Sequence, residues 1–344
     1  MRGTNPAGPA PARAAALAAV VLALPLAGCA PVPSPQGADT GTGDRAAERI
    51  LQVTSVHEAT GMTLLEGPTF DADGRLHLVD VTAPAGEPKV MRVNLDSGAV
   101  APVYTDETGA YTSAQFGPHD GRLYLTDYAG GRIVSITPDG DDPRVVAEGA
   151  IEGRPMHPDD IAFDDEGNLY VSDSSPTAYP AAAPSGRVLR FDSTTAAPSV
   201  LADHQPNPNG ISFDLDGGAL WVSQLDANRI DHLTLSEDGT AVTSGHTAVH
   251  VDGGTTQTDS NAVDAAGNVY QGVHGEPRIE VHAPDGTHLT TITVPDEHDG
   301  LESATNLAIR PGTTDAYVTV SGPAGGFVYR FDALAQGVRQ SNGG

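Results

Sequence analysis

The stretch that decides the fold is residues 163–173, which read FDDEGNLYVSD. An aromatic residue ends one apolar segment, an acidic turn with Gly167 follows, and the chain returns as an alternating segment. Glycine allows the positive backbone angle of a tight turn, so the stretch predicts two antiparallel strands. Five further copies of this unit start at Phe70 (FDADGRLHLVD), Phe116 (FGPHDGRLYLTD), Phe213 (FDLDGGALWVS), Val263 (VDAAGNVYQG) and Ile309 (IRPGTTDAYVTV).

The copies recur at a regular period, starting 46, 47, 50, 50 and 46 residues apart. A period of this length suits one four-stranded blade of a β-propeller. A third strand follows each copy, and outer strands are expected at segments such as 101–104, 145–148, 200–203 and 289–294. We therefore predict an all-β fold, a six-bladed β-propeller. A pair of β-sandwiches or a β-helix is the alternative, but neither explains this period.

The last blade lacks an outer strand, because the sixth copy reaches its third strand at residues 327–330 and the chain soon ends. Ile50 to Val56 (ILQVTSV) precedes the first copy and has strand character. We predict that this N-terminal strand pairs with the last blade and closes the ring, which hides open sheet edges.

The first residues have the pattern of a secretory signal. Arg2 and Arg13 precede an uncharged, apolar run over residues 14–26. Residues 26–29 (LAGC) resemble the lipobox of bacterial lipoproteins, in which the cysteine is lipidated and becomes the N-terminus. Cys29 is the one cysteine of the chain, which excludes a disulfide within it. An ordinary signal peptide with an incidental cysteine is the alternative.

The predicted organisation is a lipoprotein signal peptide over 1–28, a lipidated Cys29 with a flexible Pro/Gly/Ser/Thr-rich linker over 29–44, and the propeller over 45–344. The formal charge is −27, and loss of Arg2 and Arg13 with the signal makes it −29. Such a charge argues against nucleic acid or anionic lipid as a partner of the domain surface. We expect an extracytoplasmic, membrane-anchored lipoprotein whose membrane contact is the N-terminal lipid only, and the sequence leaves the oligomeric state open.

Equivalent positions of the repeats form a ring, because the innermost strand of each blade lines the channel. Four residues before each anchor, all six side chains carry oxygen: Glu66, Thr112, Asp159, Asn209, Asp259 and Thr305. The next positions are Gly67, Ser113, Asp160, Gly210, Ser260 and Asn306. Neither set contains Lys or Arg, so without a cation the carboxylates would repel one another or take up protons.

The ring donors are carboxylates, an amide carbonyl and hydroxyls, without Cys or His. This hard ligand set favours Ca²⁺ over Zn²⁺ or Cu²⁺. Mg²⁺ is the second choice, because it demands a stricter octahedron. The alternative is a polar, watery channel, as in propellers that only bind other proteins.

At these residues the chain resembles the senescence marker protein, gluconolactonase and luciferin-regenerating enzyme family of calcium-dependent six-bladed propellers, and within it the drug-responsive-protein lactonases. The resemblance rests on segments 65–67 (LEG), 159–164 (DDIAFD), 209–212 (NGIS) and 259–264 (DSNAVD), and spans roughly residues 61–337. It implies that the residues matching Glu66, Asp159, Asn209 and Asp259 bind the catalytic calcium, and that Ser260 assists. It also implies that Asp259 is the acid/base or the nucleophile. Asp160 is the alternative base, or a partner that orients Asp159.

The implied function is that of a calcium-dependent hydrolase, acting on a small-molecule lactone or related ester whose carbonyl Ca²⁺ polarises. A lyase or cyclase acting on a cyclic natural product is one alternative, and a non-catalytic binding propeller is another. The resemblance also implies a second, structural calcium in the related lactonases, but in this chain Arg154 stands in the stretch where an acidic ligand is expected, which argues against that site.

Six histidines fall near the expected channel mouth, and we expect solvated loop residues at all of them: His57, His119, His157, His204, His274 and His298. Loops 174–185, 204–208 and 295–303 are expected to shape the mouth, with the Pro/Ala-rich segment 176–184 as a wall or lid.

Overall fold

The computed structural model describes residues 44–174, 183–295 and 300–342, and these are built almost entirely of β-strands. One short 3₁₀ turn, η1 (Leu225–Ala227), is the sole helical element among them. The all-β prediction is thus confirmed. No helix within these residues is long and apolar enough to cross a membrane. Cys29 and His298 lie outside the described residues.

Four sheets of the described part each contain four consecutive antiparallel strands. The first consists of β3 (Leu65–Phe70), β4 (Leu76–Asp80), β5 (Pro88–Asn94) and β6 (Ala99–Thr105). The second consists of β7 (Tyr111–Phe116), β8 (Leu123–Asp127), β9 (Arg132–Ile136) and β10 (Arg144–Glu148). The third consists of β13 (Pro158–Phe163), β14 (Leu169–Asp173), β15 (Gly186–Phe191) and β16 (Pro198–Gln205). The fourth consists of β17 (Pro208–Phe213), β18 (Ala219–Gln224), β19 (Arg229–Leu235) and β20 (Val242–His250).

The remaining described strands form a small hairpin and one ten-stranded sheet. The hairpin pairs β11 (Ala150–Ile151) with β12 (Arg154–Pro155). The large sheet holds β21 (Gln257–Asp264), β22 (Val269–His274), β23 (Arg278–His282), β24 (His288–Thr293), β25 (Ser303–Ile309), β26 (Asp315–Gly322), β27 (Gly325–Asp332), β1 (Arg45–Ala46), β2 (Glu48–Thr54) and β28 (Gly337–Asn342). A single pair, Val273 with Ala304, joins its β21–β24 part to its β25–β27 part.

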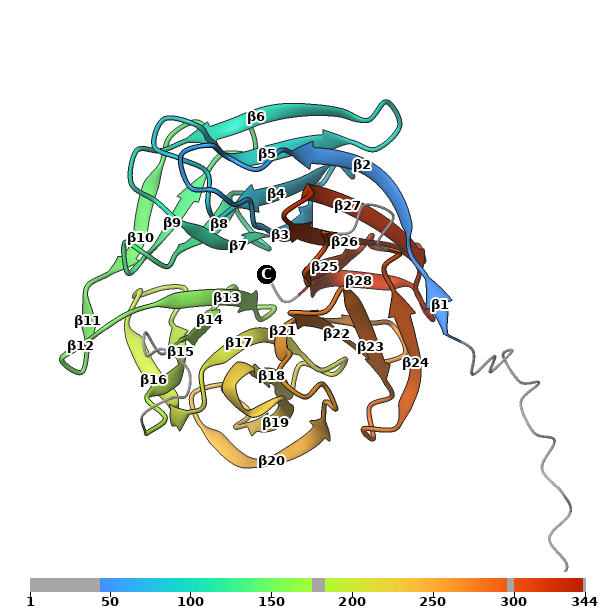
Figure 1. The fold of residues 1–344 in the computed structure, drawn as a ribbon. Helices are drawn as coiled ribbons and strands as arrows, with labels where there is room; N and C mark the ends of the chain where they lie inside the picture. The colour runs from blue at the N-terminus through green and yellow to red at the C-terminus, as the bar shows by residue number, and fades with distance from the viewer. Residues whose placement is uncertain (1–43, 175–182, 296–299, 343–344) are drawn as a thin grey trace, which may run out of the picture. The chain divides into compact units, whose positions relative to one another are not determined.

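The sheets are arranged around a common centre, as Figure 1 shows. The innermost strands β3, β7, β13, β17, β21 and β25 each lie beside the next, and β25 lies beside β3. The ring of inner strands is therefore closed, and the fold is propeller-like.

The N-terminal strand closes the ring in the way that the sequence predicts. β2 pairs antiparallel with β27, from Glu48 opposite Arg330 to Thr54 opposite Gly326. The strand begins two residues before the predicted Ile50. β1 also pairs with β24, in parallel.

The C-terminal strand β28 is not anticipated by the sequence analysis, which expects the chain to end after its last repeat. β28 pairs with the channel-facing edge of β21, with Asp264 opposite Gly337. A side chain at Gly337 would place its Cβ 2.4 Å from the Ile309 carbonyl oxygen, so glycine is required there. Segment 337–342 has little apolar alternation, and its strand conformation depends on the inner strands that it meets.

The anchor aromatic of each early repeat packs against the second strand of the repeat before it. The ring centroids of Phe163 and Tyr124 lie 5.0 Å apart and those of Phe213 and Tyr170 lie 4.9 Å apart, both edge to face. Phe116 packs in the same way on His77, and Phe70 on Tyr317 across the closure of the ring. Each such contact contributes about 0.5–1.5 kcal/mol beyond its buried area. The repeat therefore encodes the packing between sheets as well as the hairpin.

The aspartate that ends the second strand of the first three repeats holds the loop before its own sheet. Asp80, Asp127 and Asp173 are buried, and each accepts a hydrogen bond from a backbone amide of that loop. The donors are Leu64, Ala110 and His157, at N···O distances of 3.4, 3.1 and 2.5 Å. These buried carboxylates thus fix where the loops meet the channel.

We call each of these contacts between a buried aspartate and the preceding loop a clamp. Arg187 takes part in the third clamp and is itself buried. Its guanidinium forms an ion pair with Asp173 and donates to the carbonyl oxygens of Ile151 (2.8 Å) and Pro155 (3.0 Å). We expect Arg187→Met to lower the free energy of unfolding by about 3–5 kcal/mol, because the Asp173 charge is left buried and unpaired. Urea unfolding measures the loss. The Arg187→Met/Asp173→Leu double variant should recover much of it, and a double variant as unstable as the single one would contradict this account.

Candidate active site

The starts of four inner strands bring the predicted ligands to one end of the channel, which we call the ring face. Glu66 lies on β3, Asp159 on β13, Asn209 on β17 and Asp259 on β21. Asn209 Nδ2 donates to Asp159 Oδ2 at 3.3 Å, and the charges of Asp159, Asp160 and Asp259 all act on Glu66. With Ser260, these six residues form a group that we call the oxygen ring: Glu66, Asp159, Asp160, Asn209, Asp259 and Ser260.

The carboxylates of the oxygen ring are held in an environment that disfavours their charge. Burial raises the pKa of Glu66 well above its usual range, and the neighbouring carboxylates raise it further. Burial also raises the pKa of Asp259 to about 7, against hydrogen bonds from the Ser260 amide and Asn209. Asp159 keeps part of its surface exposed, yet burial raises the pKa of its carboxyl to about 7 as well. In the described part of the chain, no Lys or Arg forms an ion pair with these groups.

Asp160 lies deepest among the four carboxylates. Its side chain is buried, and neither of its oxygens has a hydrogen-bond partner of good geometry among the described residues. Burial, and next the charge of Asp159, raise the pKa of Asp160 well above its usual range, while the nearby hydroxyls of Ser260 and Ser113 offset this in part. Its backbone amide donates to Ser172 Oγ at 2.9 Å, which ties it to β14.

Two hydroxyls of the predicted ring have a different role. Thr112 Oγ1 donates to the Asp159 carbonyl oxygen at 3.0 Å, and Thr305 Oγ1 to the Leu65 carbonyl oxygen at 2.8 Å. They therefore join neighbouring inner strands through the backbone. Glycines permit the same closeness elsewhere, since a Cβ at Gly67 would lie 2.4 Å from the Ala114 amide nitrogen and one at Gly210 2.6 Å from that of Asn261.

Ser174 joins the site although sequence analysis missed it as a functional residue. Its hydroxyl lies 2.8 Å from Asp159 Oδ2 and 2.6 Å from the Pro208 carbonyl oxygen. It directly follows Asp173, the clamp residue of the third repeat, and this adjacency was the available signal.

His274 is also brought to the site, which corrects the expectation of a solvated loop histidine. It ends β22, its Nδ1 lies 3.7 Å from Asp259 Oδ2, and 3.1 Å from Ser303 Oγ. Burial lowers the pKa of His274, and the charge of Glu302 opposes this shift. The His274 imidazole is therefore neutral near pH 7. The sequence contains a signal for this difference that was missed, because the fifth repeat lacks the clamp aspartate of the first three repeats.

Four more of the histidines expected at the channel mouth lie in the described residues, and they differ among themselves. His57 is also not a free loop residue, because its Nε2 lies 2.7 Å from Asp80 Oδ2 and its side chain is only 19% exposed. His157 packs on Tyr128. His119 and His204 are exposed, as expected. None of these four makes a contact with the oxygen ring among the hydrogen bonds and ion pairs of the described residues.

The oxygen ring fits a hard cation because several of its buried oxygens are left without a hydrogen-bond donor among the described residues. Within the described part of the chain, the buried oxygens that have no hydrogen-bond partner include Glu66 Oε2, both carboxylate oxygens of Asp160, and Asn209 Oδ1. Such atoms cost stability unless a donor or a cation meets them. Over the described residues, no three His, Cys, Asp or Glu side chains are already gathered around one metal position. The fit thus rests on the donor chemistry, to which Asn209 and Ser260 also belong.

The stretch considered for a second calcium contains the β11–β12 hairpin. Arg154 there pairs with Asp203, with 2.9 Å between Nη2 and Oδ2. The guanidinium is thus occupied in a surface ion pair.

The cation-free protein is expected to lose stability as the pH rises from 5 to 8. The pKa values of Asp159 and Asp259 rise from the ordinary 3.8 to about 7 on folding, so the folded state holds these protons more tightly. That contribution is complete below about pH 4 and is lost as the pH rises through 7. Melting temperatures in EDTA at pH 5, 6, 7 and 8 measure it, with Asp160→Asn expected to flatten the profile. A melting temperature that stays level or rises over this range would refute the electrostatic account.

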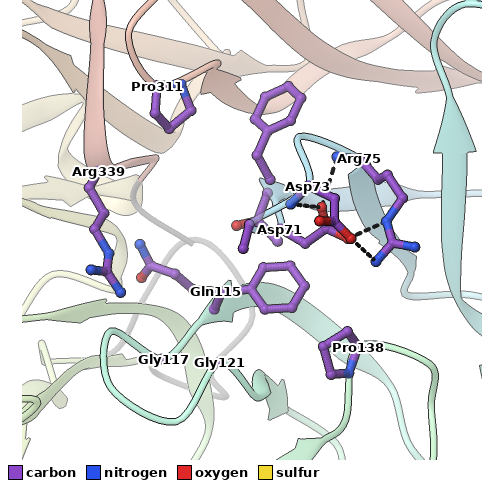
Figure 2. A pocket seen from close by; sticks show the side chains of 13 residues that line it. Asp71, Asp73, Arg75, Gln115, Gly117, Gly121, Pro138, Pro311 and Arg339 are labelled. Carbon is purple, nitrogen blue, oxygen red and sulfur yellow. Dashed lines mark hydrogen bonds and ion pairs between the residues drawn. The ribbon is translucent and has the colours of Figure 1, made fainter.

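A cavity at the opposite end of the inner strands, of about 500 Å³, is chemically different (Figure 2). It lies at the turns that follow β3 and β7, roughly 13 Å along the strand from the ring face. Its charged groups compensate one another: Arg75 binds Asp71 at 2.6 Å and Asp73 at 3.1 Å. Arg339 lines it from β28. None of the oxygen-ring residues lines this cavity, so the chemistry gathers at the ring face.

A closed ring of antiparallel sheets, with buried oxygens at one end of its channel, defines a propeller-like protein with a site for small polar chemistry. The chain belongs to the SMP-30/gluconolactonase/LRE-like family, whose sequence profile matches residues 64–322. The predicted family is thereby confirmed.

Two relatives of the chain carry the name of a lactonase. Lactonase drp35 of Staphylococcus aureus (strain USA300) is 26% identical over 282 residues, covering 79% of this chain and 84% of the relative. Lactonase drp35 of Staphylococcus saprophyticus is 27% identical with the same coverage.

Solved structures share the fold. A luciferin-regenerating enzyme superposes with a TM-score of 0.69 at 17% identity, covering 86% of this chain and 98% of the other. The calcium-binding protein regucalcin of Agrobacterium tumefaciens gives 0.68 at 17% identity, covering 87% and 99%. A gluconolactonase of Xanthomonas campestris gives 0.65 at 20% identity, covering 87% and 99%.

Proposed function

We propose that the protein is a calcium-dependent hydrolase of a lactone or related ester, working at the ring face. The observation that carries the proposal is the set of buried, mutually repelling oxygens at the start of the inner strands, which have no Lys or Arg partner among the described residues. The names of the lactonase relatives support the reaction class, and the calcium-binding regucalcin supports the ion.

Glu66, Asp159, Asn209 and Asp259 would hold the ion, and Ser260 would assist. A bound Ca²⁺ would supply Lewis-acid polarisation of the ester carbonyl. Ca²⁺ suits these donors better than Mg²⁺, because neutral and charged oxygens come from several separate strands in a loose arrangement. With the ion bound, the carboxylates that repel one another would no longer need to take up protons in order to lie close together.

Asp259 would handle the proton of the attacking water or of the leaving alkoxide. Its carboxylate is buried at the channel end and touches the half-exposed His274, so one side of it meets the solvent-accessible mouth. The Ser260 amide and Asn209 hold it in place. Asp160 is the alternative base, but its tie to β14 and its depth suit a residue that positions Asp159.

The reaction is tested by product mass. A lactone incubated with the protein and Ca²⁺ is expected to gain one water and become a hydroxy acid, with the activity lost in EDTA. A product of unchanged mass would indicate elimination or cyclisation instead, and no turnover of any lactone or aryl ester would favour a binding propeller.

The finer description of the whole chain belongs to the same proposal. The ten-stranded sheet would represent a fifth blade, β21–β24, and a sixth, β25–β27 with β2, which gives six blades over residues 45–344. Residues 1–28 would be removed, and Cys29 would carry the lipid that tethers the enzyme outside the cytoplasm. Cell fractionation of the Cys29→Ser variant tests the tether, since retention of that variant in the membrane would contradict it.

A further inference from the structure

We infer that the cavity between His274 and Met62 is the substrate-side-chain pocket of this enzyme and takes the apolar substituent of an uncharged lactone. The inference rests on the proposed function and specifies its substrate class. The cavity measures about 410 Å³ and opens on the ring face, at the loop that leads into β3 and the ends of β22 and β26.

The cavity wall is mainly apolar. Val56, Met62, Leu64 and Pro323 line it, and none of the described residues in its wall is a Lys or Arg. Met62 is 54% exposed and is one of three large apolar side chains exposed to this degree in the described residues. Exposed apolar surface of this kind beside a polar site is typical of ligand pockets, where apolar walls bind and a few polar groups orient.

His274 connects the cavity to the reacting centre. Its ring lines the cavity, and its Nδ1 also lies 3.7 Å from Asp259 Oδ2. Ser303 Oγ, 3.1 Å from the same nitrogen, holds the ring in this position and accepts a hydrogen bond from the Gly275 amide at 3.1 Å. A lactone carbonyl beside Asp259 would therefore have its substituent directed past His274 into the cavity.

The cavity borders two later repeats that lack the clamp aspartate. In β4, β8 and β14 the second strand ends in a buried Asp that ties the preceding loop to the sheet. In β22 and β26 the position of this aspartate is taken by Val273 and Val320, whose side chains cannot form hydrogen bonds. Ser321 Oγ accepts a hydrogen bond from the Leu65 amide at 2.9 Å and links β26 to the start of β3.

Charge selects against anionic substrates. The polar rim of the cavity carries the exposed carboxylate of Glu302, and the oxygen ring lies behind His274. An acidic substituent would meet repulsion without a basic partner, whereas a neutral alkyl group gains about 0.8 kcal/mol, or about 4-fold, for each methylene that it buries. The occupant is thus the alkyl chain of a neutral lactone.

The test uses the full chain with Ca²⁺ and δ-lactones that carry hydrogen, a propyl, a heptyl or a carboxypropyl group. Wild type is expected to prefer propyl over hydrogen by at least about 10-fold in kcat/KM, and to prefer propyl over carboxypropyl. Met62→Glu should lower the heptyl-to-hydrogen ratio by about 10-fold or more. Leu215→Glu is the matched control, because Leu215 is 51% exposed on the opposite face and should leave every ratio unchanged.

The outcomes separate the pocket from the reaction. Unchanged ratios in Met62→Glu, with wild type active, would overturn the pocket and leave the hydrolase intact. If no lactone is hydrolysed, calorimetry with the uncleaved heptyl δ-lactam decides: binding to wild type but not to Met62→Glu would keep the pocket and reject the hydrolase. Failure of the lactam to bind would reject the pocket as well.

Discussion

Asp259→Asn is expected to hydrolyse lactones at least about 10³-fold more slowly than wild type, since general acid–base catalysis by one side chain contributes about 10²–10⁴-fold. The amide keeps a carbonyl oxygen for the cation and nearly the same shape, but it neither accepts nor returns a proton. The loss should therefore appear mainly in kcat. Initial rates over a range of lactone concentrations, with saturating Ca²⁺, measure it.

Two controls make this result specific to the proton role. Asp216→Asn changes an exposed carboxylate on the opposite face and should retain full activity. Asp160→Asn separates the two candidate bases: moderate activity identifies it as a positioning residue, while a loss as large as that of Asp259→Asn would move the base to Asp160. Full activity of Asp259→Asn would overturn the mechanism.

Removal of calcium is expected to lower the melting temperature by about 5–10 °C. The oxygen ring brings four carboxylates together, and no Lys or Arg of the described residues pairs with them. An ion bound to the folded state alone adds about 2.7 kcal/mol at 100 times its dissociation constant. For a chain of this size each kcal/mol corresponds to about 2–4 °C. Melts in EDTA and then in graded Ca²⁺ at pH 7.5 measure the shift.

Ligand variants show whether this shift comes from the oxygen ring. Glu66→Gln should melt near or above wild type in EDTA, because a buried charge is removed, yet it should gain much less from Ca²⁺. Glu302→Gln is the control from the cavity rim and should retain the whole shift. A wild-type melt that does not respond to Ca²⁺ would remove the ion from the proposal.

The fold was predictable because its information is local and repeated. The turn at Gly167 and the anchor at Phe163 lie within one short unit, and five further copies of that unit set the period. A residue four positions before an anchor must lie at the same height in every inner strand, so Glu66, Asp159, Asn209 and Asp259 were predictable as neighbours. Closure by β2 followed from counting strands, since the last repeat was one short.

The repeat determined by itself the strand order, the packing of Phe163 on Tyr124 and the oxygens at one end of the channel. Tertiary structure alone decided what the exceptions to the repeat do. His274 resembles a loop histidine in sequence, but the missing clamp in β22 and the ring closure beside β3 place it between Asp259 and the Met62 cavity. Thr112 likewise has the ring spacing but donates to the Asp159 carbonyl, and β28 acquires its pairing only from β21. The physical reason is that a repeat specifies height along a strand, whereas the direction of a side chain and the partner of a free edge depend on neighbours that are distant in the chain.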